Sequence, residues 1–381
     1  MNQEFADAVV IGGGIIGAST IYHLAKLGLH NCVIIEQNSL GSGTTAYSAS
    51  WITLQKSSEL KIRMTQVSFK EFEELNQDIP IGLQRKGSLS INTVDAVEKE
   101  TSQAKLQNEL GVPTEIWSKE QIFEAAPILN VTDIGIGRYC PLDGLVDASA
   151  TLHAYIKKAK KLGARVIEGA KAINILIEGD RVVGVETHLG RIQTPIVVNA
   201  AGIYAKEVAA FVGLDLPLSH DLSHNVYTDP INDIPETMPL IEVLAPVVMY
   251  IGARGKLADY TIGRFEPEGF AHKPQLEKLI EQYYDDLFYR CPSIAKAPIR
   301  ECVAGIRTKT PDDLPIIGPI SQIVGYINNC GWAGRGVMHA PIAGKLAALN
   351  AIGETHDSID IGPFLAERFE RKNNEKSRAI R

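Results

Sequence analysis

A glycine-rich loop near the start of the chain has the spacing that binds a dinucleotide. The run Gly12-Gly13-Gly14-Ile15-Ile16-Gly17 fits the pattern G-x-G-x-x-G. The first glycine permits a tight turn, the second lets a pyrophosphate approach the backbone, and the third lets a helix pack close to a strand. Free N–H groups and the dipole of a helix that begins here favour an anion. The loop therefore predicts a pyrophosphate-binding site.

Glu36 is the acidic residue that such a site needs. It follows the apolar run Cys32-Val33-Ile34-Ile35, about 20 residues beyond the loop, where a carboxylate can accept hydrogen bonds from ribose hydroxyls. The same carboxylate would repel a 2′-phosphate, which argues against NADP. A structural glycine turn is the alternative, and the complete strand–loop–helix–strand unit favours dinucleotide binding. The loop by itself does not separate NAD from FAD.

A βαβ unit must position these residues. Residues 8–11 are a short β-branched run typical of a buried parallel strand, and residues 32–35 repeat that pattern. Between them, residues 15–27 predict a helix that ends at Gly28. Near the other end of the chain, a last helix is expected over 341–352. The glycine loop and Glu36 thus come from the two turns of one supersecondary unit.

The composition is that of a globular protein of two or three domains. The 381 residues are 45% hydrophobic and 22% charged, which excludes a disordered chain and a small disulfide scaffold. The net charge of −7 leaves no basic footprint for a nucleic acid. Five scattered cysteines without a CxxC pair favour a reducing compartment, and no apolar run approaches a membrane span. We therefore expect a cytoplasmic protein without a nucleic-acid partner, a membrane span or a bound metal.

Four segments together resemble the D-amino-acid oxidase superfamily, and more narrowly its glycine oxidase and sarcosine oxidase/dehydrogenase branch. They are GSGTTAYSAS (41–50), VVNAAG (197–202), AGIRTKTPD with LPIIG (304–318) and GWAGRGVMHAP (331–341), in the family's order. The resemblance spans nearly the whole chain and is weakest over 216–300. It implies an α/β fold, with a Rossmann-like FAD-binding domain of the glutathione-reductase type and an inserted α+β substrate domain on a mixed, mostly antiparallel sheet. The expected ranges are 1–85, 145–215 and 301–381 for FAD, and 86–144 and 216–300 for substrate.

The resemblance also implies which residues hold FAD. The pyrophosphate is assigned to Gly12, Gly14, Ile15, Ile16 and Gly17, the adenosine side to Glu36 and Gln37, and the adenine ring to the backbone around Ala172. The phosphates and flavin are assigned to Thr44, Thr45, Ala49, Ser50 and Trp51. The loop Gly331, Trp332, Ala333, Gly334, Arg335, Gly336, Val337 and Met338 is expected to pass over the flavin ring. A helix beginning at Pro341 would direct its positive end toward the reduced flavin.

FAD is expected to bind without a covalent link. Some relatives attach flavin to a histidine in the first threonine-rich segment, where this chain has Tyr47. Monomeric sarcosine oxidases attach it to a cysteine before the Thr-Pro-Asp, where this chain has Gly305. Cys302 lies three residues too early, and Cys302 and Cys330 are interpreted as packing thiols.

Arg307 and Tyr250 are the candidate catalytic residues, because they match the residues that hold the substrate carboxylate in the family. A guanidinium can hold a carboxylate through two parallel hydrogen bonds. A structural salt bridge for Arg307 and a core position for Tyr250 are the alternatives. His224, His339 and Arg254 are interpreted as structural. No Ser-His-Asp, metal-ligand or paired-carboxylate motif is present, which fits a reaction in which the cofactor does the difficult step.

The resemblance implies oxidation of the C–N bond of glycine, sarcosine, proline or a D-amino acid by hydride transfer to flavin N5, giving an imine that hydrolyses. The alternatives are a flavoprotein dehydrogenase of a 2-hydroxy acid or glycerol phosphate, a flavoprotein subunit of a hetero-oligomeric amine dehydrogenase, and a non-catalytic FAD-binding module. Two candidates remain for the electron acceptor, which are O2 and a quinone or partner flavoprotein. The protein can also be a homo-oligomer or a hetero-oligomer. Thr261 stands near the position of an oxygen-activating lysine of sarcosine oxidases.

Overall fold

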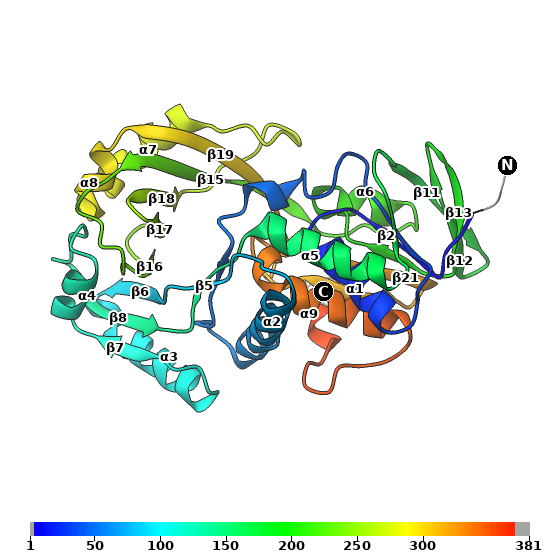
Figure 1. Cartoon of the computed structure of the whole chain (residues 1–381), viewed down its shortest axis with the longest axis horizontal. Helices are drawn as coiled ribbons and strands as arrows, with labels where there is room; N and C mark the ends of the chain where they lie inside the picture. Colours follow the sequence, from blue (N-terminus) through cyan, green and yellow to red (C-terminus); the bar gives the residue numbers. More distant parts are fainter. Residues whose placement is uncertain (1–3, 370–381) are drawn as a thin grey trace, which may run out of the picture.

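The computed structural model of the chain describes residues 4–369 and has two lobes, each built on one large sheet (Figure 1). Residues 1–3 and 370–381 of the expected domain ranges lie outside the described part. A third, three-stranded sheet joins short segments in the order β4-β9-β5. Its strands are β4 (Trp51–Ile52), β5 (Gln84–Arg85) and β9 (Gly144–Leu145).

The first lobe contains a ten-stranded sheet in the order β1-β13-β12-β21-β14-β2-β3-β10. Its strands are β1 (Glu4–Phe5), β2 (Ala8–Ile11), β3 (Cys32–Ile35), β10 (Arg165–Ile167), β11 (Ala172–Glu178), β12 (Arg181–Thr187), β13 (Gly190–Gln193), β14 (Val197–Asn199), β20 (Ile316–Ile320) and β21 (Ile323–Cys330). The run from β21 through β14, β2 and β3 to β10 is parallel. β11 pairs with β12, and β20 pairs with β21.

Both faces of the parallel strands β2, β3 and β14 are buried, which explains their largely apolar sequences. Ala8 and Val10 pack into a core with the helices, whereas Val9 and Ile11 pack into a second core with the antiparallel strands β11–β13. The helices of this lobe are α1 (Ile15–Lys26), α2 (Glu59–Asp78), α5 (Ala148–Lys161), α6 (Ala205–Ala210) and α9 (Gly336–Ala351), with short 3-10 turns at Thr44–Tyr47, Gly202–Tyr204 and Gly362–Phe364. The predicted strands over 8–11 and 32–35 and the helix from residue 15 are confirmed.

The second lobe contains an eight-stranded sheet in the order β19-β15-β18-β17-β16-β6-β8-β7, in which only β16 and β6 run parallel. Its strands are β6 (Ser88–Thr93), β7 (Glu115–Trp117), β8 (Ile134–Cys140), β15 (Ser219–Pro230), β16 (Leu240–Val243), β17 (Met249–Arg254), β18 (Leu257–Ile262) and β19 (Ile299–Lys309). Its helices are α3 (Val97–Glu109), α4 (Lys119–Ala125), α7 (Leu276–Arg290) and α8 (Pro292–Lys296), with a 3-10 turn at Val94–Ala96. The fold thus matches the expected class.

Two boundaries differ from the sequence-based expectation. β19 belongs to the eight-stranded sheet because its residues pair with β15 from Ser219 opposite Lys309 onward, so a boundary at residue 301 cuts through a strand of that sheet. The last helix begins at Gly336 rather than at Pro341, and Pro341 lies inside it. This helix tolerates the proline because it is held by α1: a Cβ added at Gly344 would lie 2.5 Å from the backbone of Ser19. No helix in residues 4–369 is long and apolar enough to cross a membrane.

Candidate active site

The glycine loop brings α1 into close contact with two strand ends. Gly12 has a φ of +110°, and a Cβ there would lie 2.4 Å from the carbonyl oxygen of Ala200, at the end of β14. A Cβ at Gly17 would lie 1.9 Å from the carbonyl oxygen of Gly12. Any side chain at either position would therefore separate α1 from the sheet. This is the packing role expected of Gly17, and the positive φ of Gly12 fits the tight turn expected there.

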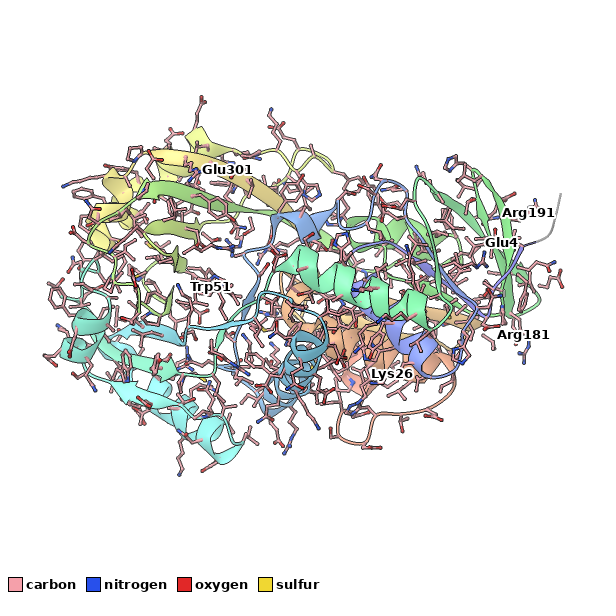
Figure 2. All side chains as sticks on the ribbon, viewed as in Figure 1. Glu4, Lys26, Trp51, Arg181, Arg191 and Glu301 are labelled. Atoms are coloured by element: carbon pink, nitrogen blue, oxygen red, sulfur yellow. The ribbon has the colours of Figure 1, made fainter. Side chains whose placement is uncertain are left out.

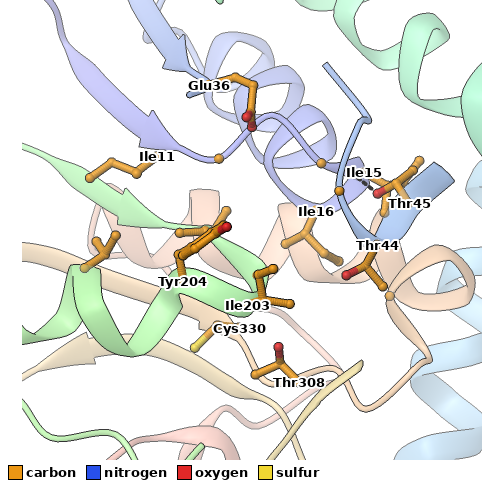
Figure 3. Close-up of a pocket in the computed structure, with 18 of the residues that line it drawn as sticks. Ile11, Ile15, Ile16, Glu36, Thr44, Thr45, Ile203, Tyr204, Thr308 and Cys330 are labelled. Carbon is orange, nitrogen blue, oxygen red and sulfur yellow. Dashed lines mark hydrogen bonds between the residues drawn. The ribbon is translucent and has the colours of Figure 1, made fainter. Parts of the chain in front are cut away.

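The N-terminus of α1 opens into a cavity and has no side-chain cap of its own, since Gly14 is its N-cap residue. Thr45 comes to it from another segment, and its Oγ1 accepts the N–H of Ile15 at 3.1 Å (Figure 3). The neighbouring Thr44 donates its hydroxyl to the carbonyl of Ile306 on β19 at 2.7 Å. The two threonines therefore tie the glycine loop in one lobe to the sheet of the other.

Glu36 is fixed at the edge of this cavity by backbone donors. Its carboxylate accepts the N–H of Gly13 at 2.7 Å and the N–H of Asn38 at 2.8 Å. A carboxylate has acceptor sites beyond these two bonds. Glu36 can therefore accept further hydrogen bonds from ribose hydroxyls, as its position in the sequence predicts.

The cavity has a volume of about 520 Å³ and is walled by residues of both lobes (Figure 3). Most of the residues assigned to FAD line it: Gly12, Gly14, Ile15, Ile16, Glu36, Gln37, Thr44, Thr45, Ala172, Gly331, Trp332, Ala333, Gly334, Gly336 and Val337. Arg307 lines it as well. The lining does not include Gly17, Ala49, Ser50, Trp51, Arg335, Met338 or Tyr250. A helix terminus at the cavity, glycines at Gly12 and Gly14 in its wall and a ribose acceptor fit the pyrophosphate and ribose of FAD.

Several lining residues were not foreseen from the sequence. Ile203 and Tyr204 follow β14 in a 3-10 turn, and Phe270 and His272 come from the loop before α7. The VVNAAG motif immediately before Ile203 could have indicated the first pair. The region 216–300 offered no comparable signal for the second pair, because nothing in its local pattern shows that this loop lies against the cavity.

The loop 331–338 lies directly against Arg307. The N–H of Ala333 donates to the carbonyl of Thr308 at 2.8 Å, and a Cβ at Gly334 would lie 2.7 Å from Cδ of Arg307. Gly334 has a φ of +80°, so glycine is favoured there by conformation as well as by space. Arg335 points elsewhere and donates to the carbonyl of Asp313 at 3.2 Å. The loop therefore shapes the cavity around the Arg307 side chain.

Arg307 already has a carboxylate partner within the protein. Its Nε and one terminal nitrogen donate to the two oxygens of Asp221 at 2.6 and 2.7 Å, and Lys309 Nζ lies 3.2 Å from the same carboxylate. Burial would raise the pKa of Asp221, but the hydrogen bonds and charges of Arg307 and Lys309 outweigh it and lower that pKa. Asp221 is therefore ionised and orients Arg307, while Arg307 Nη1 has no partner among residues 4–369.

Tyr250 lies on β17 with its ring edge-on to Trp51, at a centroid distance of 5.7 Å. Burial, and then the charge of Glu242, raise the pKa of Tyr250 to about 12. The phenol therefore keeps its proton near neutral pH and can donate it to a carboxylate. Arg264, which sequence reasoning missed, has its pKa lowered to about 10 by burial and by the charge of Arg307.

The two positions at which relatives link flavin covalently adjoin each other here. A Cβ at Gly305 would lie 3.0 Å from Cβ of Tyr47, whose ring stacks on His272 at 4.5 Å. Burial raises the pKa of the Cys302 thiol to about 11 and that of the Cys330 thiol to about 12. Both cysteines are therefore thiols rather than nucleophilic thiolates at neutral pH. Cys330 nonetheless lines the cavity.

The residues interpreted as structural have ordinary partners or solvent exposure. His339 is buried and its Nε2 lies 3.1 Å from Thr65 Oγ1. His224 Nε2 accepts the N–H of Gln275 at 2.9 Å, and Arg254 is exposed at the end of β17. Within residues 4–369, no group of three His, Cys, Asp or Glu side chains is arranged to hold a metal ion.

A Rossmann-like lobe with a glycine cradle, a ribose acceptor and a mostly antiparallel second sheet define a dinucleotide-binding flavoprotein. The model of the FAD dependent oxidoreductase family (DAO) matches residues 7–349, so the chain belongs to that family, whose members use FAD.

The chain is similar to human mitochondrial sarcosine dehydrogenase, with 30% identity over 354 residues, 87% of this chain and 38% of that protein. It thus spans less than half the length of that relative. It is 27% identical to sarcosine oxidase subunit beta of an Arthrobacter species, over 96% of this chain and 91% of that one. The solved structure of L-proline dehydrogenase from P. horikoshii superposes with a TM-score of 0.90 at 29% identity, covering 97% of this chain and 99% of that chain.

Proposed function

We propose that this protein oxidises the C–N bond of a small amino acid or N-methyl amino acid, giving an imine that hydrolyses in water. The observation that carries the proposal is a cavity that joins the dinucleotide cradle to Arg307. Tyr250 does not line this cavity, but it is close enough to Arg307 for the charge of Arg307 to affect its pKa. Relatives named for sarcosine and proline support an amine over a 2-hydroxy acid or glycerol phosphate.

In this proposal, Arg307 and Tyr250 hold the substrate carboxylate. Asp221 fixes the guanidinium from one side, so Nη1 is presented in a defined direction without the entropy cost of a mobile arginine. Tyr250 adds a neutral donor. Holding the carboxylate at one end fixes the position of the carbon next to the amine. The chemistry that FAD supplies when bound is acceptance of a hydride from that carbon.

FAD is proposed to bind without a covalent link, held by residues 12–17, Glu36, Gln37, Thr44, Thr45 and the 331–338 loop, with Ala49, Ser50, Trp51 and Ala172 completing the site. Support for this comes from Tyr47 and Gly305 at the two attachment positions and from the raised thiol pKa values of Cys302 and Cys330. The electron acceptor is proposed to be O2 or a quinone or partner flavoprotein, and the location the cytoplasm.

A second candidate is that the chain is the flavoprotein subunit of a hetero-oligomeric amine dehydrogenase. It is favoured by the end-to-end match with a protein named as subunit beta of sarcosine oxidase. In that case, the purified chain would be reduced by its amine but would turn over slowly with O2. Co-purification and size-exclusion chromatography from the native source separate this candidate from a free-standing oxidase.

The test of the main proposal is the visible spectrum of the FAD-loaded protein under anaerobic conditions. Glycine, sarcosine, proline and D-amino acids are added as a mixture and then one at a time. Loss of the oxidised flavin bands would support amine oxidation and identify the substrate. Bands that persist with every amine, yet disappear with a 2-hydroxy acid or glycerol phosphate, would overturn the proposal.

A further inference from the structure

A row of polar side chains crosses the eight-stranded sheet on one face. Glu242 on β16 lies directly opposite Tyr250 on β17, and Tyr250 lies opposite Thr261 on β18. On the other side, Glu242 lies opposite Ser90 on β6. Directly opposed residues of neighbouring strands point to the same face. Their strand neighbours, such as Ile241 and Ile251, belong to the apolar core on the other face.

The row is connected to the wall of the cavity. Thr261 donates to Asn225 Oδ1 at 2.5 Å, and Asn225 Nδ2 donates to the carbonyl of Tyr47 at 2.7 Å. Tyr47 belongs to the segment whose residues Thr44, Thr45 and Ser48 line the cavity. Trp51, four residues further on, contacts the ring of Tyr250 and lies between the two lobes (Figure 2). The polar face of the sheet therefore looks toward the flavin side of the site.

Arg264 lies near this face because the backbone turns at Gly263, directly after β18. It follows β18 after Gly263, whose φ is +68°, and a Cβ at Gly263 would lie 2.3 Å from the ring of Tyr283. Only glycine fits this turn, which breaks the strand alternation just before Arg264. The guanidinium is close enough to Arg307, Tyr250 and Asp221 for each of them to affect its pKa.

Two partly buried charges of opposite sign thus flank Tyr250 without an ion-pair partner. Within residues 4–369, Arg264 forms no ion pair and donates only to the carbonyl of Gly263. Glu242 accepts the hydroxyl of Ser90 at 2.9 Å and also interacts with the hydroxyl of Tyr250, and among residues 4–369 it forms no ion pair. Lys56 is the cation that faces Glu242, but its Nζ bonds Thr53 instead. Charges withdrawn from water need a counter-charge, so both residues are open to a ligand.

We infer that Arg264 joins Arg307 in receiving the carboxylate of the substrate and that Glu242 receives its ammonium group, so that Arg264 and Glu242 make the site specific for a zwitterion. The strands β16 and β18 flank β17, which puts their backbones about 10 Å apart. A small amino acid has the length to reach from the Glu side chain to the Arg side chain across Tyr250, which lies on the strand between them. This inference rests on the proposed function and adds to it the two residues that recognise the charges of the substrate.

The test uses the FAD-loaded protein and two probes that each carry one charge. Cyclopentanecarboxylate has the carboxylate without an amine, and pyrrolidine has the amine without a carboxylate. Their dissociation constants are measured from the change in the flavin absorption spectrum. Arg264→Gln should weaken cyclopentanecarboxylate at least about tenfold and leave pyrrolidine within about twofold, and Glu242→Gln should do the reverse.

Matched controls carry the same charge changes on exposed strand positions. Glu301→Gln on β19, at the outer rim of the molecule (Figure 2), and Arg254→Gln on β17 should move neither constant by more than about twofold. Melting temperature and flavin content verify that each variant is folded and loaded.

Equal effects of both variants on both probes, or no binding of either probe by the wild type, would overturn the inference. Failure of the proposed function gives a different result. Amino acids would then leave the flavin oxidised, even if Arg264→Gln weakens only cyclopentanecarboxylate and Glu242→Gln weakens only pyrrolidine, which is the crossed pattern of probe binding. If the wild type is bleached by an amino acid and the crossed pattern is absent, only the roles of Arg264 and Glu242 are wrong.

Discussion

The cradle of residues 12–17 and the polar face of the eight-stranded sheet offer two different means of recognising a charged ligand. In the cradle, the site is formed by backbone N–H groups, and side chains are excluded from it. A Cβ at Gly17, for example, would clash with Gly12. On the sheet, Tyr250, Glu242 and Arg307 come from three separate strands and act through their side chains. A backbone site requires a local sequence pattern, whereas a side-chain site requires only that distant strands pair.

The difference between a backbone site and a side-chain site determines which substitutions each region tolerates. The cradle is intolerant of added atoms because its backbone segments are in contact. The sheet face can exchange side chains while its strands stay paired, so specificity can change there without loss of the fold. Five predictions test how the two regions respond to change, beginning with the largest expected effect.

Gly17→Ala should abolish formation of the FAD-loaded protein. The added Cβ would lie 1.9 Å from the carbonyl oxygen of Gly12, so α1 must move away from the sheet, at a cost of about 3 kcal/mol. The measurements are the ratio of flavin to protein absorbance and the melting temperature. Gly362→Ala is the control, since it lies outside the cavity and a Cβ there would meet only the side chain of Asp360, at 3.2 Å. A Gly17→Ala protein that keeps the flavin content and the melting temperature of the wild type would contradict the idea that the cradle tolerates no added atoms.

Arg307→Ala should raise KM about 100-fold while FAD remains bound, because it removes charge-assisted hydrogen bonds worth about 3 kcal/mol. Steady-state kinetics and the flavin spectrum measure the two effects separately. If the alanine variant is unstable, Arg307→Lys is measured in its place.

Asp221→Asn distinguishes a substrate role of Arg307 from a purely structural one. It removes the ionised partner but keeps the cation, so KM should change far less than in Arg307→Ala. If the two variants instead lose equal stability and neither changes KM, Arg307 is only the partner of Asp221.

The acid stability of the cradle lobe should depend on Glu71. Its carboxylate meets His23 Nε2 at 3.1 Å and accepts the hydroxyl of Tyr155 at 2.8 Å, which links α2 to α1 and α5. Burial would raise the pKa of Glu71, but the charge of His23 and both hydrogen bonds outweigh it and lower the pKa from 4.5 to about 2.

A carboxyl with a lower pKa in the folded state binds fewer protons there, so its stabilisation is present above pH 4.5 and is lost as pH falls through about 2. The loss should approach about 3 kcal/mol. The free energy of unfolding measured by denaturant between pH 2 and 6 tests this prediction, and Glu71→Gln should flatten the curve. Glu74→Gln, exposed on the same helix, should not; a wild-type curve that is flat in this range would contradict the assignment.

Cys302→Ser should leave flavin content unchanged, and denaturation should release all FAD from both the wild type and the variant. The reason is that the raised pKa keeps the Cys302 thiol protonated, and Tyr47 and Gly305 occupy the two attachment positions of relatives. Absorbance of the supernatant after acid precipitation measures the released fraction. Flavin retained by the wild-type precipitate and lost in Cys302→Ser would show a covalent link.

The sequence predicted the cradle lobe in detail because its signals are local. Short segments of sequence are sufficient to predict its main features. These are the strands over 8–11 and 32–35, the helix from residue 15 and the close contact at Gly17. The start of the last helix was wrong by five residues. Proline is most common at a first helical turn, but packing of α9 on α1 extends the helix upstream of Pro341.

The substrate side could be predicted only in part. Arg307 could be proposed because its strand carries a recognisable motif, and the structure adds that Arg307 lines the cavity and that Asp221 holds it. Phe270, His272 and Arg264 were missed, since their segment has no periodic pattern and reaches the site through turns such as the one at Gly263.

By itself, then, the sequence determined the dinucleotide cradle, the family and the order of the motifs, because glycine spacing and apolar runs act over a few residues. Only the tertiary structure decided that Glu242 and Tyr250 share one face of the sheet, with Arg264 and Arg307 close to Tyr250. That arrangement depends on the register of strands far apart in the chain, and a shift of one residue would turn the side chains of Glu242 and Tyr250 to the opposite face.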